Sequence, residues 1–328
     1  MGFENFGLIS FATAIAAYFT IVVDNGFTVS GTRYVAKNKS NIKALNTYFS
    51  SVMSIKLCFT FLCFLILVLL RLTFPDIFTQ FSIFLFAFLI VIGNFLFPIW
   101  VFQGYEKMFY LAVINTISRA IYVVLIFTFI KVEEDYKFVT LINGISYLAS
   151  GIISLILIKH MFKISLTPIN FENLKFAFND SFNIFKSRIY AGTYNNYNLI
   201  FLGFLGNNLA VGYYAVAEKI LKALQNIYQP VLTGFYPFFI RKVREKKALF
   251  FKYFKRLTYS LFLFSSVVSV SIYVFSNEII YLLSGNYEDD IAALLRILCI
   301  AIFLSPFGPH YSNCLLYTSP SPRDRQKS

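Results

Sequence analysis

Charge is scarce in this 328-residue sequence: charged residues make up 14% of it, against about 25% in a typical soluble domain. Apolar residues make up 58%, with 41 Phe and 22 Tyr, which is more large apolar surface than one water-soluble core can bury. This composition excludes a disordered chain and a soluble domain. It also excludes an ordinary nucleic-acid-binding domain, despite the formal net charge of +13. An integral membrane protein with lipid-facing and interfacial aromatic residues is the remaining interpretation.

Residues that carry catalysis or hold metals are also few. There are two histidines, His160 and His310, and four cysteines without the spacing of a disulfide framework or a metal site. No G-x-x-x-x-G-K-[ST] phosphate loop occurs, so this chain is not expected to hydrolyse ATP. We therefore predict a protein that is not an enzyme and has no metal site and no resident cofactor.

Long apolar runs dominate the rest of the sequence. About 20 apolar residues are needed for a helix to cross a bilayer core about 30 Å thick. Nine such runs occur, without the period-2 alternation of a membrane barrel strand. They predict an all-α polytopic membrane bundle with nine spans, at 7–28, 47–70, 81–102, 109–130, 138–158, 176–203, 211–240, 257–281 and 291–310.

The connections between these runs differ in charge. Alternate connections, at 33–46, 103–108, 159–175 and 241–256, hold 16 Lys and Arg, whereas the other set holds three bases and nine acids. Because basic connections stay in the cytoplasm, the first set is predicted to be cytoplasmic and residue 1 to lie outside. A chain that begins outside at a bare Met suggests that one helix upstream of Met1 is missing.

Two lobes are predicted. The segment Gly7–Ile15 aligns weakly with Gly212–Ile220, and both open helices that run in the same direction, an arrangement found in transporters. We expect an N-lobe at 1–159, a cytoplasmic linker at 160–175 and a truncated C-lobe at 176–313. Residues 314–328 resemble the translation of a sequencing-library adapter and are excluded from the fold.

Ionisable residues within the predicted spans are the strongest functional signal, because they are costly in a membrane and usually face a cavity or a partner helix. Seven are basic and three acidic: Lys56, Arg119, Lys186, Arg188, Lys219, Lys222, Arg296, Asp24, Asp180 and Glu218. Four of the bases lie at a similar depth, about 15 Å from the cytoplasmic helix ends at 1.5 Å per residue. We predict a cationic, water-filled cavity that binds an anion; separate local ion pairs or snorkelling side chains are the alternative.

Polar and acidic residues extend this hypothesis. Tyr194, Asn195 and Asn198 lie on the same predicted helix as Arg188, where they form either a sugar-contacting face or contacts between helices. Asp24 and Glu218 are the candidates for proton or sodium coupling. Glu218 is better explained by an ion pair with Lys219 or Lys222, and Arg33 is a candidate partner for Asp24.

Three stretches carry a resemblance to a known family. The first stretch comprises Phe3–Ala12, Asp24-Asn-Gly-Phe27 and Ser30-Gly-Thr-Arg33, the second is 93–108 and the third is 211–220. They resemble polysaccharide repeat-unit flippases (Wzx-type O-antigen transporters). That family belongs to the multidrug/oligosaccharidyl-lipid/polysaccharide (MOP) exporter superfamily. The resemblance runs from about residue 2 to 313 and is most specific in 93–108. The positions that match the family pattern are Gly26, Arg33, Gly93, Asn94, Pro98, Trp100, Gln103 and Gly104.

The resemblance implies a fold and a function. It implies a two-lobed inner-membrane flippase with twelve or more helices, of which this chain lacks the first and the last two or more. Such proteins move undecaprenyl-pyrophosphate-linked oligosaccharides to the outer leaflet by alternating access, and act beside a polysaccharide polymerase and chain-length machinery. A pyrophosphate would suit the basic residues within the spans, and membrane lipids would hold the polyprenyl tail. Pro98 is expected to kink its span, and Gly93 and Gly104 to allow bending or close packing.

Three alternatives stay open. A flippase for a lipid-linked peptidoglycan precursor shares the same chemistry. A drug or cation antiporter of the same superfamily would need an acidic lumen, against the excess of bases over acids in the spans. A membrane-embedded glycosyl or acyl transferase would need a clustered His or an acidic pair, which the sequence does not show.

Overall fold

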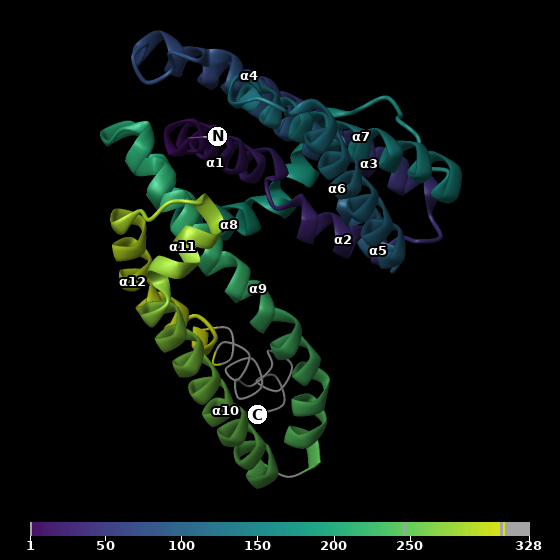
Figure 1. Cartoon of the computed structure of the whole chain (residues 1–328). Helices are drawn as coiled ribbons and strands as arrows, with labels where there is room; N and C mark the ends of the chain where they lie inside the picture. The colour runs from purple at the N-terminus through teal and green to yellow at the C-terminus, as the bar shows by residue number, and fades with distance from the viewer. Residues whose placement is uncertain (1, 246, 309–310, 312–328) are drawn as a thin grey trace. The chain divides into compact units, whose positions relative to one another are not determined.

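The computed structural model describes residues 2–245, 247–308 and 311, without the side chains of 191–196 and 228–251. The chain forms two compact units, Met1–Gly212 and Tyr213–Ser328, and each is described by itself (Figure 1). The described residues are helical and contain no strand, so the predicted all-α class is confirmed. Residues 314–328, predicted to be non-native, lie outside the described part.

The first unit holds most of the helices. They are α1 (Phe3–Asp24), α2 (Phe27–Lys37), α3 (Ile42–Thr73), α4 (Phe81–Phe95), α5 (Ile99–Gly104), α6 (Met108–Phe129), the short η1 (Glu133–Asp135), α7 (Tyr136–Phe162), α8 (Phe171–Leu205) and the first residues of α9 (Asn208–Glu245). The second unit holds the rest of α9, then α10 (Lys247–Val274), α11 (Ser276–Ser284) and α12 (Asp289–Leu304).

Six helical segments of the described chain are long and apolar enough to cross a membrane, whereas nine spans were predicted. Six of the predicted ranges overlap these segments, and 176–203, 211–240 and 291–310 fall outside them. The helix α12 has only 16 residues, and α8 and α9 carry many polar and charged side chains. The protein is therefore a multi-pass membrane protein with fewer strongly apolar segments than the runs suggested.

Glycine and serine residues allow α4 and α7 to pack closely. A Cβ atom at Gly93 would lie 2.5 Å from the carbonyl carbon of Tyr147, and one at Gly144 would lie 2.6 Å from Leu89 Cβ. Ser154 of α7 is fully buried and donates to the main-chain oxygen of Leu96 at 3.2 Å. Close approach through Gly and Ser is the usual way in which helices associate in lipid. Gly93 thus serves packing, one of its two predicted roles.

Three of the predicted spans are interrupted helices. The expected break at Pro98 is confirmed, because α4 ends at Phe95 and α5 begins at Ile99. The predicted span 7–28 was wrong as a continuous helix: α1 ends at Asp24 and α2 continues to Lys37. These two breaks lie in the first unit, where α2 packs against α5. The predicted span 257–281 was also wrong as a continuous helix, since α10 ends at Val274 and α11 begins at Ser276.

The compact units of the structure are defined by packing, and the predicted lobes stay a prediction. Helix α8, assigned from sequence to the C-lobe, packs against α1, α2 and α3 and belongs to the first unit. The predicted linker 160–175 is also tied to α3, since Ser50 Oγ accepts from the Thr167 amide at 2.7 Å and Asn46 Oδ1 accepts from the Ser165 amide at 3.0 Å. The boundary by packing therefore falls at Gly212, within α9.

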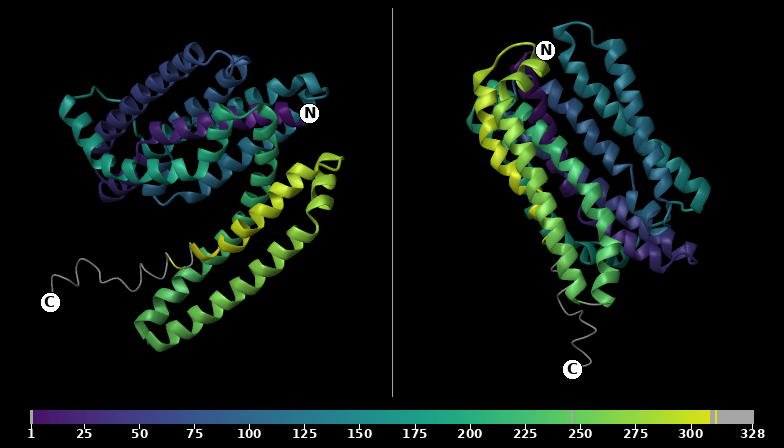
Figure 2. Two further views of the ribbon diagram at one scale, coloured as in Figure 1. Left: turned by 90° about the vertical axis from the view of Figure 1, so that its left-hand side faces the viewer. Right: turned by 60° about the horizontal axis from the view of Figure 1, so that its bottom comes forward.

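In the second unit, α10 and α12 lie side by side and antiparallel (Figure 2). Phe262 meets Phe303 at a ring-centroid distance of 5.5 Å, and Ser269 donates to the Cys299 carbonyl at 2.8 Å. Arg296 of α12 contacts the first turn of α11, which follows α10. It donates to Ser276 Oγ at 2.8 Å and to Asn277 Oδ1 at 3.2 Å. Arg296 therefore joins α12 to α11.

Candidate functional site

The break between α1 and α2 brings polar groups into an otherwise apolar helix. Asn25 ends α1 in the left-handed conformation, with φ 45°, and Gly26 follows with φ 77°. A Cβ atom at Gly26 would lie 2.9 Å from Ile184 Cβ and 3.0 Å from the Phe185 amide nitrogen of α8. Glycine is therefore required twice at this position, for the positive φ and for the contact with α8.

Asn25 fastens the break to α8. Its side chain is fully buried, and Nδ2 donates to Ser181 Oγ at 2.9 Å. Within the described residues, its Oδ1 has no hydrogen-bond partner. Leaving a buried acceptor without a hydrogen bond costs about 1–3 kcal/mol of stability. The Asn25 side-chain oxygen is such an acceptor within the described part of the chain.

Asp24, the last residue of α1, is the centre of the charges at the break. Its Oδ2 lies 3.4 Å from Arg188 Nη1 of α8, and its Oδ1 accepts from Thr28 Oγ1 at 2.7 Å. This ion pair joins the end of α1 to α8.

Lys56 is 3% exposed, and its Nζ donates to the Asn94 main-chain oxygen at 3.2 Å. Asn94 lies in the last turn of α4, one residue before that helix ends at Phe95. Carbonyl oxygens at a helix C-terminus carry partial negative charge and stabilise a nearby cation. The break before Pro98 thus provides the acceptor that holds Lys56 inside the unit.

A second ion pair lies between α2 and α8. Arg33 Nη2 lies 2.5 Å from Asp180 Oδ1, and both side chains are partly exposed. Arg33 was predicted to lie in a cytoplasmic connection and to be a candidate partner of Asp24. It lies within α2 and pairs with Asp180. The pairing was missed because 147 residues separate the two.

We define the charge network as the two ion pairs, Arg33–Asp180 and Arg188–Asp24, together with the buried Lys56, whose ammonium donates to a main-chain oxygen. With three bases and two acids it carries a net charge of about +1 when all the groups are ionised. Arg188 is 41% exposed and Asp180 is 25% exposed, so part of the charge network remains accessible. Ion pairs between helices, the alternative interpretation, are therefore present here, and the anion-binding cavity stays a prediction.

The other predicted site residues lie apart from the charge network. Arg119 of α6 donates to Tyr147 Oη at 2.6 Å and lies 5.0 Å from the centre of that ring. Lys186 is an exposed residue of α8, and its Nζ lies 4.7 Å from the centre of the Phe182 ring. Neither contact involves an acid.

In the second unit, Glu218 pairs with Lys222 at 3.0 Å, which confirms the expected ion pair. Lys219 is exposed on the same helix. On α8, Asn198 is exposed, and the side chains of Tyr194 and Asn195 lie outside the described residues. The predicted sugar-contacting face stays a prediction.

Several of the positions that carried the family resemblance lie where α2 packs against α5. Thr32 Oγ1 donates to Gln103 Oε1 at 2.9 Å, and a Cβ atom at Gly31 would lie 2.7 Å from the Trp100 ring. A Cβ atom at Gly104 would lie 2.5 Å from Val35 Cβ. These motif residues therefore allow α2 and α5 to pack closely.

A family model described as "Polysaccharide biosynthesis protein" matches residues 1–243, which is most of the chain. The chain belongs to this family. It is 28% identical over 238 residues to a putative O-antigen transporter of Escherichia coli K12, covering 72% of this chain and 57% of that protein. It is 24% identical over 237 residues to a putative O-antigen transporter of Shigella dysenteriae, covering 72% and 59%. The chain therefore spans less than two thirds of these relatives.

The fold has a solved counterpart. The structure matches the inward-facing conformation of a multidrug resistance transporter of the MATE family, in the MOP superfamily, with a TM-score of 0.67. The match covers 96% of this chain and 80% of that one at 15% identity, so it shows the fold alone. The polysaccharide biosynthesis family and the MOP-type helical fold, both expected from the resemblance, are confirmed.

Proposed function

We propose that this chain is part of a flippase that moves a polyprenyl-pyrophosphate-linked oligosaccharide across the bacterial inner membrane by alternating access, without covalent chemistry. The observation that carries the proposal is the net positive charge network at the break between α1 and α2. The names of the two O-antigen transporters support this substrate class. The substrate would be delivered and consumed by other enzymes, among them a polysaccharide polymerase and chain-length machinery.

In this proposal, the pyrophosphate exchanges with the carboxylates of the charge network. Arg188 is the best-placed first contact, because it is partly exposed and its 3.4 Å contact with Asp24 is long for a charge-assisted hydrogen bond. The guanidinium group has a planar fork of donors that suits a phosphate. A phosphate displacing Asp24 would free that carboxylate for Lys56 or for a proton. Asp24 is therefore our candidate for coupling, and Glu218, which is bound to Lys222, is the second.

Complementation of a strain that lacks its own O-antigen transporter tests the proposal. In the full-length gene product, Arg188→Ala should lower surface O-antigen about tenfold or more, since each 1.4 kcal/mol of lost anion stabilisation is a factor of ten. Arg188→Lys should retain part of the activity. Arg119→Ala tests the wider cavity predicted from sequence, at a site that the structure places beside Tyr147.

The cellular location of the substrate separates a flippase from the alternatives. When a flippase fails, the lipid-linked oligosaccharide should accumulate complete on the cytoplasmic side. Accumulation of an incomplete oligosaccharide would instead support a transferase. Wild-type surface O-antigen in Arg188→Ala, at wild-type expression, would contradict the proposed role of the charge network.

A further inference from the structure

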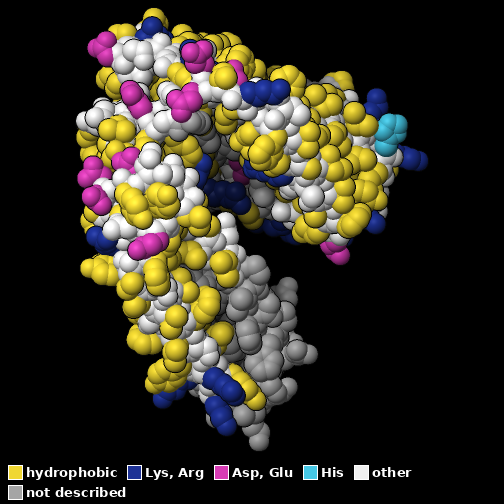
Figure 3. All heavy atoms as spheres, in the orientation of Figure 1, with side chains coloured by type: hydrophobic (Ala, Val, Ile, Leu, Met, Phe, Trp, Pro, Cys, Tyr) yellow, Lys and Arg dark blue, Asp and Glu magenta, His cyan; other side chains and the backbone are white. Residues whose placement is uncertain are grey.

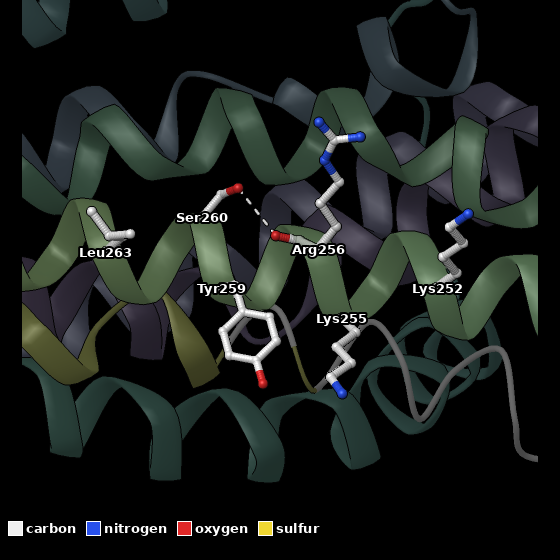
Figure 4. Close-up of a pocket in the computed structure, with 6 residues that line it drawn as sticks. All are labelled: Lys252, Lys255, Arg256, Tyr259, Ser260 and Leu263. Carbon is white, nitrogen blue, oxygen red and sulfur yellow. Dashed lines mark hydrogen bonds between the residues drawn. The ribbon is translucent and has the colours of Figure 1, made fainter.

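A basic face of α10 borders an open surface cavity in the second unit (Figure 4). The cavity has a volume of about 410 Å³, and the described residues that line it are Lys252, Lys255, Arg256, Tyr259, Ser260 and Leu263. Lys255 Nζ lies 5.7 Å from the centre of the Tyr259 ring. Among the residues that the structure describes, no carboxylate lies within 4 Å of these three cations.

The face continues along the helix as an apolar stripe. At 3.6 residues per turn, Lys252, Arg256 and Tyr259 share one side of α10 with Leu263, and the same side continues through Val267, Val270 and Val274. The four apolar residues are more than half exposed, from 57% at Val267 to 67% at Leu263. The opposite side packs inward and comprises the buried residues Leu257, Leu261, Ser265 and Ile272.

The three cations lie at one end of a membrane-crossing segment. The apolar span of α10 runs from Lys252 to Val274, so the basic residues lie in its first turns and the apolar stripe extends toward its other end. Lipid phosphates lie at this boundary of a bilayer, and acyl chains extend inward from them. The charge asymmetry of the connections assigns this end of α10 to the cytoplasmic leaflet.

We propose that this face of α10 binds an anionic phospholipid. Its phosphate would lie among Lys252, Lys255 and Arg256, and its acyl chains along Leu263, Val267 and Val270. The order of cations, then Tyr and Ser hydroxyls, then aliphatic side chains matches the order of groups along a phospholipid. A free phosphate would use only the basic half of the face, so the exposed stripe favours a lipid as the occupant.

Lipid binding to the purified chain in detergent tests this proposal. The retained lipid is measured by native mass spectrometry, with dioleoylphosphatidylglycerol as the probe. Dioleoylphosphatidylcholine controls for the net charge of the headgroup, and inorganic pyrophosphate controls for a soluble anion. The triple variant K252Q/K255Q/R256Q should bind phosphatidylglycerol roughly 100-fold more weakly, because each basic residue near an anionic surface contributes about a fivefold effect.

A matched control removes the same charge elsewhere. K37Q/K43Q/K159Q loses three exposed lysines from other basic connections and should keep wild-type affinity. The single variant Lys255→Gln, with about a fivefold loss, provides the same test if the triple variant does not fold. The double variant L263N/V267N should also weaken phosphatidylglycerol binding, because it removes the acyl contact and leaves the cations in place.

Several results would overturn the proposal. Equal loss in both triple variants would show nonspecific attraction to net charge, and equal retention of phosphatidylcholine would show that the headgroup is not recognised. Pyrophosphate that competes with the lipid and binds L263N/V267N as tightly as wild type would identify a soluble-anion site. Unchanged affinity in the α10 triple variant would remove the site altogether.

Discussion

The charge network holds one more base than it has acids. Arg188 of α8 pairs with Asp24, whereas the ammonium of Lys56 on α3 donates to the Asn94 main-chain oxygen. The second acid of the charge network, Asp180, is already held by Arg33 at 2.5 Å. Desolvating an unpaired charge is expensive, so a surplus base in this position is stabilised either by the end of α4 or by a bound anion. Lys56 uses the first solution, which leaves Arg188 as the base most available to a ligand.

Gly26 is predicted to be irreplaceable at the break. Gly26→Ala introduces both a positive-φ strain of about 1–2 kcal/mol and a clash with Ile184 and the α8 backbone. The thermal midpoint of the purified chain should fall by several degrees. Gly285→Ala is the matched control: its φ is 76°, and a Cβ atom there would meet nothing within 4 Å. Equal losses in the two variants would show that the contact with α8 contributes nothing.

The contact of Glu106 with Lys39 is predicted to depend on pH. It joins the connection between α5 and α6 to the connection between α2 and α3. Glu106 Oε1 accepts from Lys39 Nζ at 2.7 Å, and this hydrogen bond lowers the pKa of the Glu106 carboxyl from 4.5. A lowered folded-state pKa gives a contribution to stability that is full above pH 4.5 and is lost as the pH falls through the folded pKa. The difference in thermal midpoint between wild type and Glu106→Gln should therefore shrink below pH 4.5. A difference that is constant from pH 7 to about pH 3 would contradict this.

At the scale of helices, hydropathy predicts where a helix lies better than where it is interrupted. The nine apolar runs correspond to helices, and Pro98 marks one break because it cannot continue the main-chain hydrogen bonding. The break at Asn25 and Gly26 was missed, since two small or polar residues hardly change a long apolar pattern. The contacts of Arg33 with Asp180 and of Arg188 with Asp24 also could not be predicted, because they depend on how α8 packs against α1 and α2.

The break between α4 and α5 is predicted to depend on Pro98. Pro98→Ala would let the helix continue and would rotate Trp100 away from Gly31 of α2. Trp100 is the only tryptophan of the chain and is 1% exposed, so its fluorescence reports directly on this contact. We expect a red shift of its emission in Pro98→Ala, and none in Pro168→Ala, which changes an exposed proline in the connection before α8. Unchanged Trp100 emission in both variants would mean that the break forms without Pro98.

At the scale of the whole chain, charge is separated along the membrane normal of the first unit. Apolar side chains cover the middle of its visible surface, and Lys, Arg and His side chains project at one end (Figure 3). The exposed Lys37, Lys39 and Lys43 lie in or beside the connection between α2 and α3, whereas Asp76 lies in the connection that follows α3. Helix α3 has 32 residues, about 48 Å at 1.5 Å per residue, which is long enough to place these connections on opposite sides of a bilayer.

This separation predicts the orientation of the chain in a cell membrane. In a background with every cysteine replaced by serine, Ser40→Cys and Asp76→Cys place one thiol in each of the connections that flank α3. Because the more basic connection stays in the cytoplasm, a membrane-impermeant maleimide added to intact spheroplasts should label Cys at position 76 and spare position 40. Both should react once the membrane is opened with detergent, which controls for accessibility. Labelling of position 40 alone in intact spheroplasts would invert the topology, and with it the leaflet in which α10 meets its proposed lipid.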